Sequence, residues 1–119
     1  MQDVLVLDDE KNIRLTVRRC LEGAGLSVDE ALNGEEAFTL LAGKAYGLLL
    51  LDLKLPGMDG MEVLRRVRIE YQQLPVIIIS AHGSIQTAVQ AMKSGALDFL
   101  EKPFTPNDLR QVVLKALGK

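Results

Sequence analysis

Short, strongly apolar runs alternate along this chain with segments whose apolar residues recur at helical spacing. Continuous apolar runs are typical of strands buried on both faces of a parallel sheet. We therefore expect strands at residues 3–7, 27–31, 47–51, 75–80 and 97–101. The segments between and after them predict helices at residues 11–24, 34–42, 60–71, 85–93 and 106–117.

A strand–helix pair repeated in this way predicts an α/β fold, a (βα)5 doubly wound parallel sheet with right-handed crossovers. The first helix should cover one face of the sheet and later helices the other. Residues 27–31, with the sequence SVDEA, make the weakest predicted strand and should lie near an edge. Gly residues follow several predicted helices, and Thr105 before Pro106 is typical of a helix start.

Polar residues stand at the ends of the predicted strands. Asp8 and Asp9 follow the first strand, Asp52 the third, Ser80 ends the fourth and Lys102 follows the fifth. In an open α/β sheet, ligands bind in the crevice beyond the carboxyl ends of the strands, so these side chains should converge there. Clustered carboxylates favour a hard divalent cation, and a lysine with a hydroxyl suits a phosphoryl group.

The composition narrows the classes of function. The chain has 119 residues, 48% of them hydrophobic and 4% aromatic, which predicts a single domain with an aliphatic core. A net charge of −2 provides no electrostatic basis for direct contact with nucleic acid or membranes. No signal peptide or membrane-spanning run is recognisable, and the single cysteine, Cys20, fits a reducing cytoplasm. Cys20 lies on the apolar side of the first predicted helix, where we expect it to be buried.

Four short motifs follow one another along the chain: LDDE at 7–10, LDLKLPGMDG at 51–60, ISAHG at 79–83 and EKPF at 101–104. In this order and at these spacings they resemble the receiver domain of two-component response regulators. The resemblance covers residues 1–119 and implies one flavodoxin-like domain with strand order 2-1-3-4-5. Residues 82–104 are similar to receivers of nitrogen-regulation-type transcriptional activators, so the chain is expected to be either a domain trimmed from a longer regulator or a stand-alone receiver.

The resemblance implies a role for each acidic residue. Asp52 would be the nucleophile and the site of phosphorylation. Mg²⁺, with Mn²⁺ as an alternative, would be bound directly by Asp9 and Asp52, through water by Asp8, and by the main-chain carbonyl of Lys54.

The resemblance also implies the phosphoryl-binding and switch residues. Lys102 and the Ser80 hydroxyl would hold the phosphoryl oxygens, assisted by the backbone N–H groups of Leu53 and Ala81. Ser80 and Phe99 would move when the domain is activated. The peptide bond between Lys102 and Pro103 is expected to be cis, as in the family's matching turn. His82, the single histidine, reads as a loop residue.

The partner implied is a sensor histidine kinase or a phosphotransfer protein. The domain would catalyse only its own phosphorylation and slow dephosphorylation, so it is not an enzyme acting on other substrates. We expect the kinase to dock over the first helix, near Leu15 and Arg18, beside Phe104. Phosphorylation is expected to promote a homodimer through residues 85–93, 97–101 or 106–117, and to control transcription.

Three other functions fit parts of the pattern. A haloacid-dehalogenase-type phosphatase would need an Asp two residues after the nucleophile, where this chain has Lys54. A flavodoxin-type flavin carrier would need a phosphate-binding first loop, and Asp8, Asp9 and Glu10 would repel a phosphate. A degenerate receiver that only binds partners would not need the full set of acidic, hydroxyl and lysine side chains.

Overall fold

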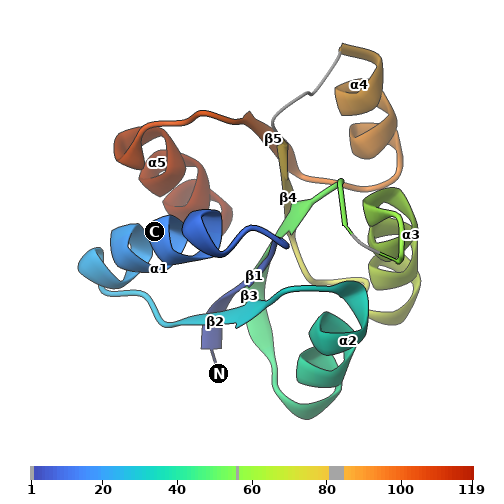
Figure 1. Ribbon diagram of the computed structural model, residues 1–119, viewed down its shortest axis with the longest axis horizontal. Coiled ribbons are helices and arrows are strands. Elements are labelled where there is room, and N and C mark those ends of the chain that lie inside the picture. Colours follow the sequence, from blue (N-terminus) through green and yellow to red (C-terminus); the bar gives the residue numbers. More distant parts are fainter. Residues whose placement is uncertain (1, 56, 81–84) are drawn as a thin grey trace.

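Strands and helices alternate throughout residues 2–55, 57–80 and 85–119, which the computed structural model describes (Figure 1). Each predicted element is present, and no boundary differs from its prediction by more than one residue. The strands are β1 (Gln2–Leu7), β2 (Val28–Ala31), β3 (Tyr46–Asp52), β4 (Val76–Ser80) and β5 (Asp98–Glu101). The helices are α1 (Lys11–Gly23), α2 (Gly34–Gly43), α3 (Gly60–Glu70), α4 (Ile85–Lys93) and α5 (Pro106–Ala116).

The strands form one parallel sheet in the order β2-β1-β3-β4-β5, which confirms the predicted topology. β2 lies at an edge, as its weak pattern predicted. In the register, Leu7 of β1 lies beside Leu51 of β3 and Ala31 of β2. The carboxyl ends of β1 and β3 are therefore adjacent, and the residues that follow them face one crevice.

Alternate side chains of each central strand point to opposite faces of the sheet and contribute to two separate cores. Side chains of Leu5, Leu49 and Ile78 pack with α2, α3 and α4, whereas Val4, Leu50 and Ile77 pack with α1 and α5. Burying an aliphatic side chain of this kind stabilises a fold by roughly 1.5–3 kcal/mol, so the two cores hold the sheet between its helices.

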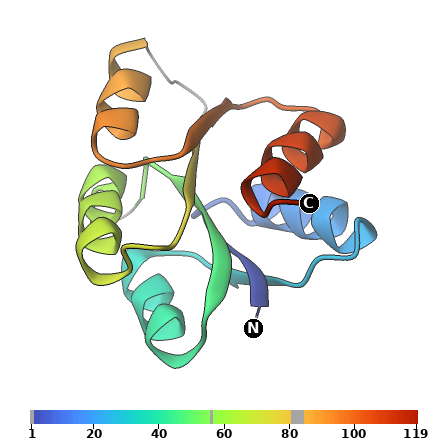
Figure 2. The same cartoon turned by 180° about the vertical axis from the view of Figure 1, so that it is seen from behind.

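The arrangement of the helices corrects one expectation. Figures 1 and 2 show α1 and α5 together on one side of the sheet and α2, α3 and α4 on the other. The last helix thus returns to the face of the first instead of staying with the later ones. It does so because Leu109 and Val113 of α5 complete the core started by Val17 and Leu21 of α1.

The junction of α1 and α5 also changes the expected burial of the cysteine. Cys20 is only half-buried. It lies where α1 meets the start of α5, and its Sγ donates to the Pro106 carbonyl oxygen at 3.3 Å. The start of α5 is as predicted: Thr105 caps the helix by accepting a hydrogen bond from the Asp108 N–H, and Pro106 follows it. Among the described residues, no helix has the length and apolar character required to cross a bilayer.

Candidate functional site

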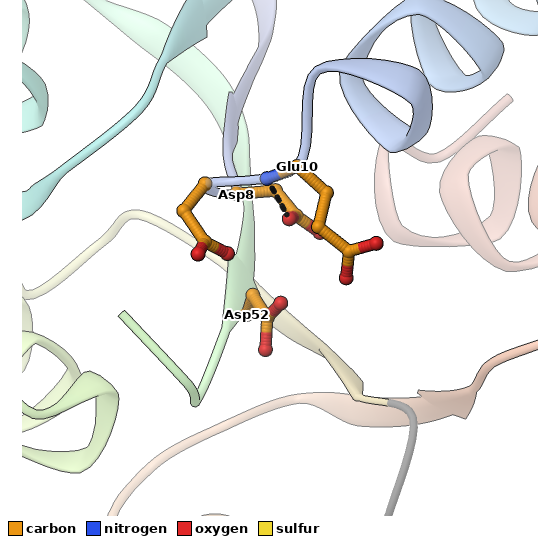
Figure 3. A group of neighbouring side chains, drawn as sticks. Asp8, Glu10 and Asp52 are labelled. Atoms are coloured by element: carbon orange, nitrogen blue, oxygen red, sulfur yellow. Dashed lines mark hydrogen bonds between the residues drawn. The ribbon is translucent and has the colours of Figure 1, made fainter. Parts of the chain in front are cut away.

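The carboxylates predicted to converge do so at the carboxyl ends of β1 and β3. Asp8 follows β1 and is fully buried, and Asp52 ends β3 with an exposed fraction of 3%. Figure 3 shows both with Glu10 around a common space. One carboxylate oxygen from each of Asp8, Asp9, Glu10 and Asp52 lies within 4.8 Å of the others. The arrangement is suited to a divalent cation with oxygen ligands.

Lys102 supplies the positive charge at the same point. Its Nζ lies 2.9 Å from Asp8 Oδ2, 3.0 Å from Asp52 Oδ2 and 3.4 Å from Glu10 Oε1. The lysine is buried. It follows β5, so strands at the centre and at the edge of the sheet contribute to one cluster. The single ammonium leaves this acidic group with excess negative charge.

Main-chain hydrogen bonds orient the two buried carboxylates. The Glu10 N–H donates to Asp8 Oδ1, the contact drawn in Figure 3, and the Lys54 N–H donates to Asp52 Oδ1, each at 2.9 Å. The other oxygen of each carboxylate faces Lys102. Asp8 Oδ2 is buried and, although close to the ammonium, has no partner that meets hydrogen-bond geometry.

Burial and mutual repulsion determine the ionisation of the cluster. Burial raises the pKa of Asp8 above its ordinary value, the Asp52 charge adds to this, and the attraction of the Lys102 ammonium and the hydrogen bond from the Glu10 N–H only partly oppose it. For Lys102, burial alone would lower the pKa, but its close contacts with the Asp8 and Asp52 carboxylates outweigh it and raise the pKa above its ordinary value. Lys102 is thus held as a cation, and a bound metal would stabilise Asp8 as an anion.

The remaining predicted residues lie around this cluster or outside the described part of the chain. Ser80 ends β4 and is buried, and Phe99 of β5 is half-buried against the core on the α2–α4 side. Lys54 is exposed, and Leu53 is buried directly after Asp52. The Lys102–Pro103 bond is cis, which confirms that prediction. Ala81 and His82, expected to serve as a phosphoryl-binding backbone and a loop residue, lie outside the described residues.

Two features of the site were missed at the level of sequence. Glu10 joins the acidic group, although only Asp8 and Asp9 were predicted to bind the metal. Gly60, the first residue of α3, lies so close to the end of β3 that a Cβ there would be 2.6 Å from Leu53 O and 2.7 Å from Asp52 O. Glu10 could have been identified, because it belongs to the LDDE motif. The close approach at Gly60 could not, because it depends on residues that only the fold brings together.

A separate hollow lies at the opposite end of the sheet. It has a volume of about 980 Å³ and is lined by residues at the amino ends of β1 and β3, the loop before β4 and the end of the chain. Of its charged lining residues, Asp3 already accepts a hydrogen bond from the Ser27 N–H, and Lys44 already pairs with Asp29. The acidic cluster beside Lys102 is therefore the stronger candidate for chemistry.

The family is decided by a match of residues 4–114 to the response regulator receiver domain. This chain is a receiver domain. The relatives include the DNA-binding transcriptional regulator NtrC of Salmonella typhimurium, 40% identical over 97% of the chain. The putative response regulator NtrX-like protein of Rickettsia bellii is 44% identical over 95% of the chain. Each match covers 24% of the relative, so the chain spans about a quarter of their length.

Solved structures agree with this assignment. The receiver domain of NtrX from Brucella abortus matches with a TM-score of 0.93 and 39% identity, covering 98% of this chain and 99% of that one. A CheY-like receiver domain protein from Methanospirillum hungatei has a TM-score of 0.93 at 26% identity, covering 99% of this chain and 94% of that one. The receiver domain therefore carries the pattern of nitrogen-regulation-type regulators on a flavodoxin-like fold.

Proposed function

We propose that this receiver domain is a phosphoacceptor and that Asp52 takes the phosphoryl group. The supporting observation is the meeting of Asp52 with Lys102 and three further carboxylates at the carboxyl ends of the strands. Asp52 is the proposed acceptor because it ends the central strand of the sheet and accepts a hydrogen bond from Lys102, whereas the facing oxygen of Asp8 has no such bond. An aspartate carboxylate is a suitable nucleophile for phosphoryl transfer.

We assign a Mg²⁺ site, with Mn²⁺ as an alternative, to the side chains of Asp8, Asp9 and Asp52 and the carbonyl of Lys54. The residues fit such an ion, since Asp8 Oδ2 is buried without a hydrogen-bond partner and the cluster has more negative than positive groups. When bound, the ion offsets negative charge on the acceptor and on the incoming phosphoryl group. Glu10 is an additional carboxylate that holds Lys102 from the solvent side.

The reaction is phosphoryl transfer from a phosphohistidine to Asp52. A carboxylate oxygen of Asp52 forms a bond to phosphorus while the phosphorus–nitrogen bond breaks, so the imidazole leaves and an acyl phosphate remains. The Lys102 ammonium, which contacts Asp52 before the transfer, then pairs with a phosphoryl oxygen. Water later cleaves the acyl phosphate, which returns Asp52 and releases inorganic phosphate. The domain thus catalyses its own modification and does not act on another substrate.

The same proposal gives Ser80 and Phe99 the role of a switch. The Ser80 hydroxyl would bond the phosphoryl group, with the N–H groups of Leu53 and Ala81 completing the cradle. Ser80 ends β4 beside Glu101 of β5 in the register, and Phe99 lies beside Ile78. A shift of Ser80 toward the phosphoryl group would therefore be transmitted to β5, whose Phe99 is half-buried against the core.

We propose a sensor histidine kinase or phosphotransfer protein as the donor, docking over α1. Leu15 lies on the outer side of α1 with an exposed fraction of 37%, and the half-buried Phe104 packs against the core that α1 and α5 share. Arg18, expected to contact the kinase, is already bound to Glu22 and Glu30. The apolar side chains are therefore the stronger candidates for contact with the kinase.

For output, we propose that phosphorylation promotes a homodimer through α4, β5 or α5 and so regulates transcription. Support comes from the surface of this region, where Val89, Met92 and Leu97 are exposed by 45%, 44% and 52%. The two relatives reported above are named as a DNA-binding transcriptional regulator and a putative response regulator. A stand-alone receiver that acts through other proteins is the alternative, distinguished by a strictly monomeric activated form.

The phosphoacceptor role is tested with acetyl phosphate and intact-protein mass spectrometry. We expect one phosphoryl adduct on the native chain, dependent on Mg²⁺, and none on Asp52→Asn. Asp59→Asn is the matched control, because Asp59 is an exposed residue of the loop after β3 and asparagine can replace it as the cap of α3. Equal labelling of native chain and Asp52→Asn would overturn the assignment.

A further inference from the structure

Arg14 of α1 connects the edge strand β2 to the acidic turn after β1. Its Nη1 donates to the main-chain carbonyl oxygen of Asp8 at 2.7 Å, and its Nε pairs with Glu30 Oε1 at 3.1 Å. The Arg14 side chain is only 13% exposed. One guanidinium group thus joins a main-chain atom between two proposed metal ligands, Asp8 and Asp9, to a carboxylate on another strand.

We propose that Arg14, held by Glu30, is a positioning residue for the magnesium-binding carboxylates; this rests on the magnesium assignment above. The reason lies in the peptide unit between Asp8 and Asp9. This unit is planar, so fixing the Asp8 carbonyl also fixes the direction in which the chain enters Asp9. Asp9 is exposed, so packing contributes little to its orientation.

The main chain at Asp8 is held from both sides. Its N–H donates to the Ala31 carbonyl of β2 at 3.1 Å, and its carbonyl accepts from Arg14. Without Arg14, the N–H bond would hold the end of β1 while the following peptide could rotate. The carboxylates of Asp8 and Asp9 would then spend less time in one arrangement, which weakens the binding of an ion that demands near-ideal octahedral geometry.

The contact requires an arginine oriented by a fixed carboxylate. The guanidinium group presents several donors in a rigid fork, which lets Nε and Nη1 serve two acceptors at once. Glu30 is itself held, because Arg18 Nη1 pairs with its other oxygen and Arg18 Nη2 donates to the Val28 carbonyl at 2.8 Å. Glu30 lies beside Val6 in the register, close to the end of β1.

Charge and positioning predict opposite effects on metal binding. Arg14 is a cation near the acidic cluster, so repulsion alone makes Mg²⁺ bind more weakly in its presence. Removing the charge should therefore tighten binding if Arg14 acts only through its field. If Arg14 positions the carboxylates, removing it should weaken binding.

The test is a Mg²⁺ titration of the full chain, followed by backbone amide NMR shifts, with thermal unfolding of each variant recorded in EDTA. We expect Arg14→Gln to bind Mg²⁺ roughly tenfold more weakly than the native chain, as for other residues that orient metal ligands. Arg18→Gln is the comparison variant, since it also removes a Glu30 partner but leaves Arg14 bonded to the Asp8 carbonyl; its loss of affinity should be clearly smaller than that of Arg14→Gln. Glu30→Gln should weaken binding, and combining it with Arg14→Gln should add little.

Other results of the titration would contradict the positioning role or the magnesium assignment. Affinity in Arg14→Gln equal to or above that of the native chain would overturn the positioning role, as would an equal loss in Arg18→Gln. Should Arg14→Gln fail to fold, Arg14→Lys provides the test: it keeps the charge but cannot reach both acceptors, and native affinity in that variant would overturn the proposal. Failure of the native chain itself to bind Mg²⁺ would instead overturn the magnesium assignment.

Discussion

Lys102 donates a hydrogen bond of 3.0 Å to Asp52 Oδ2 across 50 positions of sequence. Both side chains are buried, with exposed fractions of 8% and 3% for the two residues. Removing charges from water is costly, and here the cost is offset because Lys102 also lies beside Asp8. The pair therefore places a cation directly against the proposed nucleophile, where an incoming phosphoryl group would meet the same lysine.

Replacing the lysine should separate its effect on stability from its effect on metal binding. Lys102→Gln leaves buried carboxylates without their cation, so in EDTA we expect the free energy of unfolding to fall by about 3 kcal/mol. Mg²⁺ should bind the variant more tightly, because the competing ammonium is gone, and should restore much of the lost stability. Acetyl phosphate should label it more slowly.

Urea unfolding with and without Mg²⁺ measures the stability, and mass spectrometry measures the labelling. Lys54→Gln is the control, because Lys54 is exposed and contributes through its main chain. Unchanged stability of Lys102→Gln in EDTA would show that the ion pair does not balance the buried charge.

Gly60→Ala should displace the main chain at Asp52 and Leu53. The added methyl group would lie 2.6 Å from Leu53 O and 2.7 Å from Asp52 O, and these are main-chain atoms that cannot rotate away. We expect a loss of about 1–3 kcal/mol in stability, as for other overpacked positions, and slower labelling of Asp52. Urea unfolding and the labelling rate are the measurements.

Gly23→Ala provides the contrast for this substitution. Gly23 is the last residue of α1, and a Cβ there meets nothing within 4 Å. Alanine should leave stability unchanged or raise it, because it is the better helix former. Equal effects of the two substitutions would contradict the close-contact explanation.

The network at Asp29 should make stability depend on acid pH. Burial alone would raise the pKa of Asp29, but hydrogen bonds from Tyr46, Gln2 and Lys44 outweigh it and lower the pKa below its ordinary value of 3.8. A carboxylate with a lowered pKa in the folded state stabilises the fold above its unfolded pKa, and this contribution is lost as pH falls through the folded pKa.

The substitution Asp29→Asn tests this contribution. At pH 7 we expect a loss of about 1 kcal/mol, because the charge-assisted bonds are weakened. The difference from the native chain should shrink as the pH falls below about 3.8. Glu70→Gln, which removes an exposed ion pair with Arg66, should change stability by less than about 0.5 kcal/mol. A pH-independent difference at Asp29 would contradict the electrostatic origin.

Self-association after activation should depend on the exposed apolar residues of α4. Val89→Lys places a charge in the proposed contact surface, so we expect it to prevent the dimer that beryllofluoride and Mg²⁺ induce in the native chain. Ile69→Lys is the control, because Ile69 is 74% exposed on α3, outside α4, β5 and α5. Analytical ultracentrifugation across micromolar to millimolar concentrations measures the effect. Dimers in activated Val89→Lys would place the interface elsewhere.

The helices and strands, and the gathering of polar residues at the strand ends, could be predicted from the sequence alone. Short segments carry the apolar runs of β1, β3 and β4 and the helical spacing of α1, so these patterns can be recognised without knowledge of the fold. The residues at the strand ends, Asp8, Asp52 and Lys102, were predictable for the same reason: parallel strands bring their carboxyl ends to one edge.

How these segments meet depends on contacts between residues that are far apart in the sequence. The return of α5 to the face of α1, the close approach of Gly60 to β3 and the reach of Arg14 from Glu30 to Asp8 join residues that no local pattern relates. The contact of Lys102 with Glu10 spans 92 positions. Such contacts depend on the crossovers, the sheet register and the length of each side chain, and these become defined only when the whole core packs.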